Sequence, residues 1–293
     1  MSEMQVGLIG LGRIGGQLAL NLLASGAAVF GFDVVAKPAF VAAGGQFLAS
    51  PAEVADAASI ILHSLPSVSA LNAVIDGPVG LLHRCGPQHV IADLSTYPLA
   101  DKLAARDRLA TRGAHFLDCQ ITGSPEMLVE RRGVIFASGD HAAAKRCAPI
   151  FAAAVARNFF VGEFGAATRL KTANNLLVAL NTAAAAEALA LAVSAGIEPQ
   201  LAIEVMGAGA GQSQMFAQRA PLMAERSYDG KSSQLATFTV YLDLIEAELR
   251  RSAVHAPLAR AAVALYRQAI TDGFGANDMA CIYELIAPQG PGD

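Results

Sequence analysis

Lys171 is the residue of this sequence best placed to move a proton. It stands among apolar residues in the segment 165–175, and Asn175 follows it by four residues, with Asn174 beside it. If the segment is a helix, Lys171 and Asn175 share one face. Burial would lower the pKa of a lysine from about 10.4 toward the range useful for proton transfer at neutral pH. The alternative interpretation is an ordinary surface lysine on an amphipathic helix.

A glycine-rich turn near the N-terminus could hold a phosphate group. It follows an apolar run at 5–10 and precedes a helical pattern at 17–24. The turn has the G-x-G-x-x-G pattern and comprises Gly10, Gly12, Arg13, Ile14 and Gly15, with Leu11 between the first two glycines. In this pattern the glycines allow a tight turn, close approach of a pyrophosphate, and packing of helix on strand. The helix N-terminus offers N–H groups to the anion, so the pattern predicts dinucleotide binding.

Asp33 supplies the second half of this prediction. It ends the apolar run 28–32 and lies 18 residues after Gly15. A carboxylate at this point can accept hydrogen bonds from the adenosine ribose, and it would repel a phosphate on that ribose. The sequence therefore predicts NAD as the cofactor. NADP stays possible because Lys37 is near, and a solvent-exposed turn is the alternative role for Asp33.

The elements that must position these residues follow from hydrophobic periodicity. Further apolar runs at 59–65 and 89–94, separated by helix-like segments such as 51–58, continue a strand and helix alternation typical of a parallel sheet covered on both faces. After about Gly162 the strand-like runs stop and helical patterns take over. These cover residues 168–195, 199–206, 214–226, 234–251 and 256–272.

The predicted fold class is α/β, with two domains. Residues 1–162 are expected to form an N-terminal Rossmann domain with a doubly wound sheet, and residues 163–293 an all-α domain. No low-complexity linker separates them. We therefore expect a packed junction.

Composition argues against several classes of partner. Lys and Arg number 21 and Asp and Glu 25, so the net charge is −4, and neither predicted domain is basic. This disfavours nucleic acid and a polybasic membrane tether. Hydrophobic residues make up 54% of the chain, but polar residues interrupt the most apolar segment, 176–195, so it is predicted to be a buried helix of a soluble protein. Four scattered cysteines and the lack of a signal-peptide pattern predict a cytoplasmic protein, and the six histidines show no metal-ligand spacing, so no metal is expected.

Taken together, these features resemble the β-hydroxyacid dehydrogenase family, which includes 3-hydroxyisobutyrate dehydrogenase and tartronate semialdehyde reductase. The resemblance covers nearly the whole chain, and the order and spacing of its segments are more specific than any one of them. The matching segments are 7–15, 65–66, 93–96, 118–124, 133–139, 165–175 and 242–244. The resemblance implies hydride transfer between a nicotinamide and a small β-hydroxyacid or its semialdehyde or ketone.

The resemblance also implies a role for individual residues. Lys171 would be the general acid/base and Asn175 would help hold the substrate. Thr122-Gly123-Ser124 would cradle the substrate carboxylate, and Asp243 would lie beside the cleft. The remaining cofactor-binding residues would be Leu65, Pro66, Ser95 and Thr96, of which the serine and threonine line the nicotinamide pocket. The resemblance further implies that the all-α domain serves substrate binding and dimerisation and that the active site lies between the domains. Relatives form dimers or tetramers, so a homodimer or homotetramer is expected.

The sequence departs from the family pattern at two places. Thr122-Gly123-Ser124 replaces Ser-Gly-Gly, and Cys119-Gln120 replaces Ala-Pro. Leu242 and Phe238 stand where relatives often carry lysines, and Leu235 where a phenylalanine is common. If these residues line the cleft, they make it more apolar and less positive. The hypothesis is that the substrate carries a bulkier or more apolar tail, or fewer acidic groups, than tartronate semialdehyde.

Two alternative functions stay open at this stage. An imine or aldehyde reductase would share the architecture, but imine reductases generally carry Asp or Tyr at the position that matches Lys171, so the Lys171 and Asn175 pair favours hydroxyacid chemistry. A non-catalytic NAD(P)-binding protein is the second alternative. Sugar-phosphate oxidation of the 6-phosphogluconate type is disfavoured, because the chain lacks the long helical tail and an evident arginine cluster.

Overall fold

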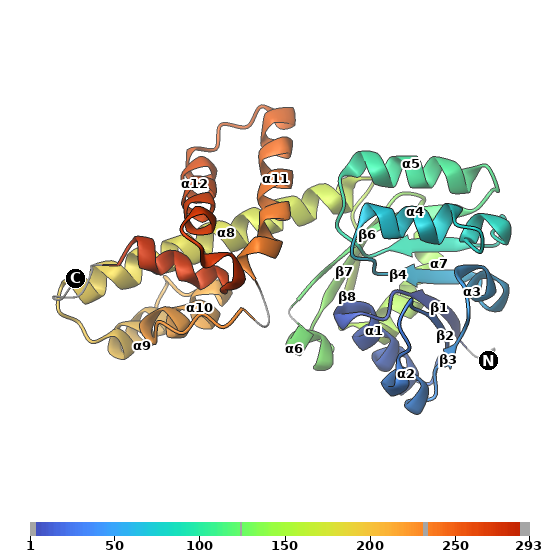
Figure 1. Cartoon of the computed structure of the whole chain (residues 1–293), viewed down its shortest axis with the longest axis horizontal. Coiled ribbons are helices and arrows are strands. Elements are labelled where there is room, and N and C mark those ends of the chain that lie inside the picture. Colours follow the sequence, from blue (N-terminus) through green and yellow to red (C-terminus); the bar gives the residue numbers. More distant parts are fainter. Residues whose placement is uncertain (1–3, 124, 231–233, 288–293) are drawn as a thin grey trace. The chain divides into compact units, whose positions relative to one another are not determined.

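The chain divides into two compact units, Met1–Lys171 and Thr172–Asp293. The structure is a computed structural model, and it describes residues 4–123, 125–230 and 234–287. The first unit contains a sheet with helices on both faces, and the second is helical, as Figure 1 shows for each unit. The predicted fold class, a doubly wound α/β domain followed by an all-α domain, is confirmed.

The sheet of the first unit has eight strands in the order β3-β2-β1-β4-β5-β6-β7-β8. The strands are β1 (Gln5–Ile9), β2 (Ala28–Phe32), β3 (Gln46–Phe47), β4 (Ile60–His63), β5 (Val90–Asp93), β6 (His115–Thr122), β7 (Val134–Ser138) and β8 (Arg157–Phe160). All neighbouring pairs are parallel except β6 with β7, which is antiparallel. The sheet is thus mostly parallel, as expected, and β7 and β8 run opposite to the other six strands. The short connection from β6 to β7 holds only one small helix, and a parallel crossover needs about a dozen residues or more.

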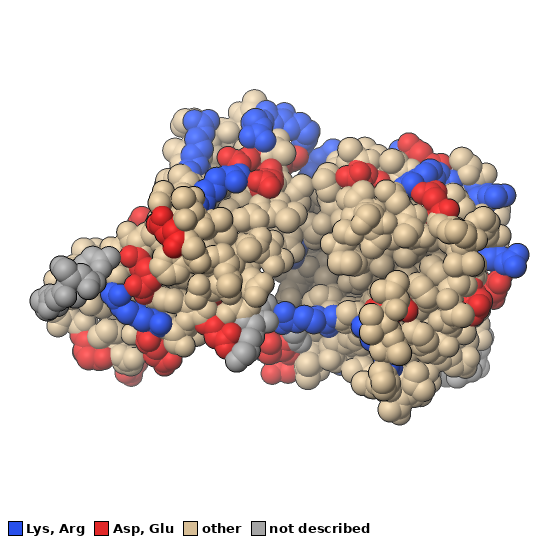
Figure 2. Space-filling view, in the orientation of Figure 1, with Lys and Arg blue, Asp and Glu red and all other residues tan. Residues whose placement is uncertain are grey.

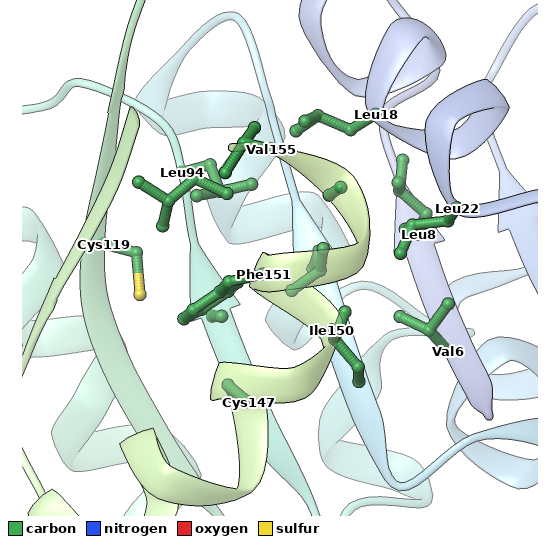
Figure 3. Close-up of a cluster of buried hydrophobic side chains, with 14 of the residues drawn as sticks. Val6, Leu8, Leu18, Leu22, Leu94, Cys119, Cys147, Ile150, Phe151 and Val155 are labelled. Atoms are coloured by element: carbon green, nitrogen blue, oxygen red, sulfur yellow. The ribbon is translucent and has the colours of Figure 1, made fainter. Parts of the chain in front are cut away.

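Helices cover both faces of this sheet. They are α1 (Arg13–Ala24), α2 (Pro38–Ala42), α3 (Pro51–Ala57), α4 (Val68–Asp76), α5 (Leu99–Ala110), α6 (Pro125–Val129) and α7 (His141–Ala154), with a short turn η1 (Leu81–His83). Buried side chains of α1 and α7 pack on one face, and those of α3, α4 and α5 pack on the other. Figure 3 shows Leu18 and Leu22 of α1 and Ile150 and Phe151 of α7 in one cluster with Leu8 of β1.

A row of polar residues crosses the middle of the sheet on the face that α5 covers. His63, Asp93, Asp118 and Ser138 are register partners in β4, β5, β6 and β7, and all four are fully buried. Lys102 of α5 is also fully buried, and its amine lies 3.1 Å from an Asp93 oxygen and 2.9 Å from an Asp118 oxygen. One cation thus sits between two carboxylates on neighbouring strands, where like charges alone would repel.

The long helix α8 (Ala166–Ser194) begins against this row. Its first turns count with the first unit because the backbone N–H of Thr168 donates to Asp118 and the amine of Lys171 donates to the Ile121 carbonyl. The boundary predicted after residue 162 marks where the strands end, whereas the compact units separate at Lys171.

The second unit is built from helices around one core. They are the remainder of α8, then α9 (Pro199–Ala208), α10 (Gln214–Ala224), α11 (Leu235–Ser252) and α12 (Pro257–Thr271), followed by the turns η2 (Phe274–Ala276) and η3 (Met279–Leu285). Tyr266 of α12 is fully buried in this core and donates a hydrogen bond from its hydroxyl to the Ala179 carbonyl of α8. One side of α8 therefore packs in the helical core, through residues such as Ala186 and Leu189.

Within the described residues, α8 is the one helix long and apolar enough to cross a membrane by length and composition. Thr168 and Thr182 of this helix are buried, and the Lys171 amine bonds β6. On the face seen in Figure 2, Lys and Arg side chains are intermixed with Asp and Glu, with broad uncharged areas between them.

The polar row makes stability depend on pH. Burial raises the pKa of Asp93, but Lys102, His63 and the Ser95 N–H outweigh it and lower the pKa to about 2. A lowered pKa means that this carboxylate stabilises the fold above its ordinary pKa of about 3.9, and that the contribution is lost as the pH falls toward 2. The shift corresponds to about 2 kcal/mol at neutral pH.

We therefore expect Asp93→Asn to lower the unfolding free energy at pH 7 and to flatten its fall between about pH 4 and pH 2. Urea unfolding followed by circular dichroism across this range measures both effects. Asp107→Asn, an exposed position on α5, is the matched control and should change neither. An unchanged acid slope in Asp93→Asn would contradict the prediction.

Candidate functional site

The predicted cofactor residues lie where strands of the first unit end. β1, β2, β4, β5 and β6 run parallel, so their carboxyl ends meet at one edge of the sheet. The strand order reverses direction between β1 and β4, and ligands of doubly wound sheets bind at such a switch point. The turn after β1 reaches this point, because a Cβ on Gly10 would lie only 2.3 Å from the Ser64 carbonyl oxygen after β4.

Two of the three motif glycines are required by the protein itself. Gly10 has a φ of +86°, a conformation that other residues rarely adopt. A Cβ on Gly15 would lie 2.0 Å from the Gly10 carbonyl oxygen, so this glycine lets α1 pack close to the turn. Both therefore shape the turn whether or not a ligand is bound.

Gly12 differs from the other two glycines. Its φ of −70° suits any residue, and no described atom lies within 4 Å of the position that its Cβ would take. It is the N-cap of α1, and as a glycine it has no side chain to cap that end of the helix. Arg13 and Ile14 form the first turn behind it. The open space in front of a helix N-terminus fits a pyrophosphate, because helix ends attract anions.

Asp33 lies directly beside this turn. Its Oδ2 accepts a hydrogen bond from the Leu11 N–H at 2.8 Å, and its Oδ1 accepts one from the Val35 N–H at 3.0 Å. The Lys37 amine lies 3.4 Å from Oδ2. A carboxylate has about four acceptor sites, so two backbone bonds leave capacity for ribose hydroxyls. The structure thus brings Asp33 and the glycine turn together, which the sequence spacing predicts.

The turns after β4 and β5 are joined in the same way. The Leu65 N–H donates to Ser95 Oγ at 2.9 Å, and the Tyr97 hydroxyl donates to the Leu65 carbonyl at 3.0 Å. Pro66 beside them is exposed. The Thr96 hydroxyl donates to Oε1 of Gln120 at 2.9 Å, which links this group to β6. The four predicted residues of these two turns therefore form one connected group.

Lys171 lies beside the end of β6. Its amine donates to the Ile121 carbonyl at 2.9 Å, and burial lowers the pKa of Lys171 to about 8. Thr122 ends the strand directly after Ile121, and Gly123 follows with a φ of +135°. A carbonyl oxygen accepts from both the ammonium and the neutral amine, so this contact permits Lys171 to gain and lose a proton. Ser124 lies outside the described residues.

The other predicted substrate residues belong to the helical unit. Asn175 is on α8 one turn after Lys171 and is largely buried. Asp243 is on α11, where its exposed carboxylate pairs with Arg267 of α12 at 2.8 Å. Its role beside a substrate stays a prediction. Among the described residues there is no group of three His, Cys, Asp or Glu side chains that could hold a metal ion.

The structure corrects one interpretation of the sequence. Leu235, Phe238 and Leu242 were expected to widen an apolar cleft wall, but all three are buried in the core of the helical unit. Phe238 packs against the ring of Tyr266, with 5.9 Å between ring centroids. Because these side chains fill the helical core, they give no support to a bulkier or more apolar substrate.

Sequence patterns missed the buried polar groups around Lys171. Asp118 accepts a hydrogen bond from Thr168 at the start of α8, and Gln120 donates one to the Ser95 carbonyl. Lys102 forms an ion pair with Asp118. Gln120 was visible only as a departure from the family pattern. The burial of Lys102 could not be predicted from the sequence, because a lysine on a helix is ordinarily solvent-exposed and only the packing of α5 buries this one.

Known proteins match the chain over both units. Residues 5–162 match the family described as the NAD binding domain of 6-phosphogluconate dehydrogenase, and residues 165–286 match that described as NAD-binding of NADP-dependent 3-hydroxyisobutyrate dehydrogenase. The 2-(hydroxymethyl)glutarate dehydrogenase of Eubacterium barkeri is 32% identical over 213 residues, which are 72% of this chain and 71% of that protein. The chain belongs to the β-hydroxyacid dehydrogenase family.

Other members of the family agree along nearly the full length. The L-threonate dehydrogenase of Cupriavidus necator is 29% identical over 284 residues, covering 96% of this chain and 95% of that protein. The crystal structure of 3-hydroxyisobutyrate dehydrogenase from Salmonella typhimurium superposes with a TM-score of 0.85 at 26% identity, covering 97% of this chain and 100% of that one. The predicted function is confirmed at this level: the chain is an oxidoreductase that transfers a hydride between a nicotinamide cofactor and a hydroxyacid or its semialdehyde.

The contrast between Gly12 and Gly15 yields a test of the cofactor site. We expect Gly12→Ala to fold normally and to raise the Kd for NADH by about tenfold or more, because the methyl group would enter the space that a pyrophosphate approaches. Gly15→Ala should instead lower the melting temperature, since its methyl group meets the Gly10 carbonyl. Nucleotide fluorescence titration and thermal unfolding measure the two effects. Undiminished NADH binding by Gly12→Ala would contradict the assignment of the site.

Proposed function

We propose that this chain is an NAD-preferring dehydrogenase or reductase of a small β-hydroxyacid, with Lys171 as its general acid/base. One observation carries the proposal: a partly buried lysine amine, held 2.9 Å from the Ile121 carbonyl, with a pKa lowered by desolvation to about 8. The pKa of Lys171 shows no contribution from a neighbouring carboxylate that would keep it permanently protonated. An amine of this kind is suited to proton transfer near neutral pH.

Lys171 is proposed to act as a base in oxidation and as an acid in reduction. A nicotinamide bound at this site would supply the hydride acceptor for oxidation and the hydride donor for reduction. In oxidation, neutral Lys171 takes the proton of the substrate hydroxyl, so that the C–O bond becomes a carbonyl. In reduction, the Lys171 ammonium donates a proton to the carbonyl oxygen. The Ile121 carbonyl keeps the amine oriented in both protonation states.

The residues near Lys171 are proposed to orient the substrate. Thr122 and Gly123 follow the Ile121 carbonyl directly, so their hydroxyl and backbone N–H groups suit a substrate carboxylate, with Ser124 as the next candidate. Asn175, one helical turn after Lys171, is proposed to bond the substrate as well. Ser95 and Thr96 are proposed to line the nicotinamide, because they lie in the turn that follows β5, next to β6.

The preference for NAD is proposed from the place of Asp33. Its carboxylate accepts a hydrogen bond from the Leu11 N–H in the glycine turn. This contact supports the proposal that Asp33 lies near the adenosine ribose of a bound cofactor. A 2′-phosphate on that ribose would meet this negative charge. The Lys37 amine, 3.4 Å away, offsets part of the charge, so NADP binding is weakened rather than abolished.

We also propose a cytoplasmic homo-oligomer. Leu177 and Leu191 of α8 and Leu201 and Val205 of α9 are exposed in the single chain, and such residues are commonly covered by a second copy. The hydroxyacid is the proposed partner. Nucleic acid and membrane partners are not expected from the charge balance.

The proposed role of Lys171 predicts a loss of turnover when this residue is replaced and a specific pH dependence of kcat. Lys171→Ala should lower turnover about a hundredfold or more while leaving the Kd for NADH near that of the wild type. For the wild type, kcat of reduction should fall as the pH rises through about 8, because reduction needs the ammonium. The kcat of oxidation should rise through the same pH, because oxidation needs the neutral amine. Turnover of Lys171→Ala within a few fold of the wild type would refute the role.

The role of Asp33 predicts a change of cofactor preference. Asp33→Ser removes the charge but keeps a short polar side chain, and it should shift the ratio of kcat/KM for NAD over NADP toward NADP by about tenfold or more. Steady-state rates with each cofactor measure the ratio. Asp56→Ser, an exposed aspartate of α3 paired with Arg84, is the control and should leave it unchanged. An unaltered ratio in Asp33→Ser would remove the basis for the NAD preference.

A further inference from the structure

The first turn of α8 is bound to the sheet by buried polar groups that have no part in the roles proposed above. Asp118 accepts two hydrogen bonds from Thr168, one from its backbone N–H at 2.9 Å and one from its hydroxyl at 2.7 Å. The Ser138 hydroxyl donates to Asp118 at 3.1 Å and accepts from the Ala167 N–H at the same distance. Asp118 and Ser138 thus satisfy N–H groups that a helix N-terminus leaves without partners of its own.

Lys102 supplies the opposite charge for this cap. Its amine lies 2.9 Å from Asp118 and 3.1 Å from Asp93, and all three side chains are fully buried. Burial lowers the pKa of Lys102, but the two aspartates outweigh it and raise the pKa above its ordinary value. Lys102 is therefore a cation, and without it two carboxylates would face each other in a dry interior.

Gln120 connects this cap to the Ser95 turn. Its side-chain N–H groups donate to the Ser95 carbonyl at 2.9 Å and to the Thr168 hydroxyl at 3.4 Å. Its Oε1 accepts from the Thr96 hydroxyl at 2.9 Å. One buried amide therefore joins the two residues proposed to line the nicotinamide with the helix that carries Lys171.

Lys171 follows Thr168 by three residues on the same helix, and its amine contacts the residue directly after Gln120 on β6. The helix and the strand are thus fastened at two points, Thr168 on Asp118 and Lys171 on Ile121. Because one helical turn is rigid, loss of the Thr168 contact with Asp118 would also displace the Lys171 amine from the Ile121 carbonyl. We propose that Asp118, Gln120 and Thr168 are positioning residues that hold the Lys171 amine in its partly buried place beside the Ile121 carbonyl, with Lys102 as the counter-charge. This inference rests on the proposed role of Lys171.

Thr168→Val tests the proposal with little change in shape. It removes the hydroxyl that bonds Asp118 and Gln120 and adds no charge. We expect the pKa of Lys171 to rise by about half a unit or more toward about 10.4, because the amine becomes more hydrated. We expect kcat to fall about tenfold with an unchanged Kd for NADH, and the pH profile of kcat to move with the lysine pKa.

The pKa is measured without substrate or cofactor, by NMR titration of the full chain labelled at lysine Cε. The chain has five lysines, and the Lys171 signal is the one that disappears in Lys171→Arg. The titration therefore judges the positioning of Lys171 even if Lys171→Ala were to leave turnover intact and so refute the proposed function.

Two further variants separate positioning from a general structural effect. Thr168→Ser restores the hydroxyl and should return the pKa and kcat to near the wild-type values. Thr182→Val makes the same change on the same helix at a buried threonine whose hydroxyl bonds the Val178 carbonyl, and it should lower the melting temperature without moving the Lys171 pKa. A Lys171 pKa in Thr168→Val that is unchanged or lower, or one that moves equally in Thr182→Val, overturns the proposal.

Discussion

The structure depends on how two aspartates are accommodated in the middle of a buried sheet. Asp93 and Asp118 are register partners on neighbouring strands, and Lys102 reaches both from α5. The remaining acceptor capacity of Asp118 is used by Thr168 and Ser138, so the same carboxylate that needs a cation also starts the long helix α8. The sheet, α5 and the first turn of α8 are therefore held together by one group of charged side chains. A change in one of these side chains alters the contacts of the others.

This arrangement places a lysine where its chemistry is useful. Asp118 faces a cation, whereas the amine of Lys171, one turn after Thr168 on α8, donates to the Ile121 carbonyl oxygen. The pKa values of the two lysines therefore shift in opposite directions: carboxylates raise the pKa of Lys102, and burial lowers the pKa of Lys171. Their different surroundings make one lysine a permanent structural cation and suit the other to proton transfer, although both stand in mostly buried surroundings.

Much of the architecture was predictable because it follows from local patterns. Strand β2 has the predicted bounds, and the predicted helix 168–195 corresponds to Ala166–Ser194. The glycine turn and Asp33 could be placed together because a strand, a turn and a helix of fixed lengths bring them to one edge. The antiparallel β7 was missed, because strand direction depends on the path of a connection rather than on periodicity. The interpretation of Leu242 failed because resemblance locates a residue along a helix but does not show which side chains the helical core will bury.

The sequence by itself determined the class of fold, the dinucleotide turn and the identity of Lys171 as the candidate acid/base, since each is carried by residue type and by spacing along the chain. Only the tertiary structure decided what surrounds that lysine. Lys102, Asp118, Gln120 and Thr168 come from two helices and a strand, separated by up to 66 positions in the chain. Hydrogen bonds and charge pairs between such residues arise when the sheet and its helices close on one another, and no local pattern records them.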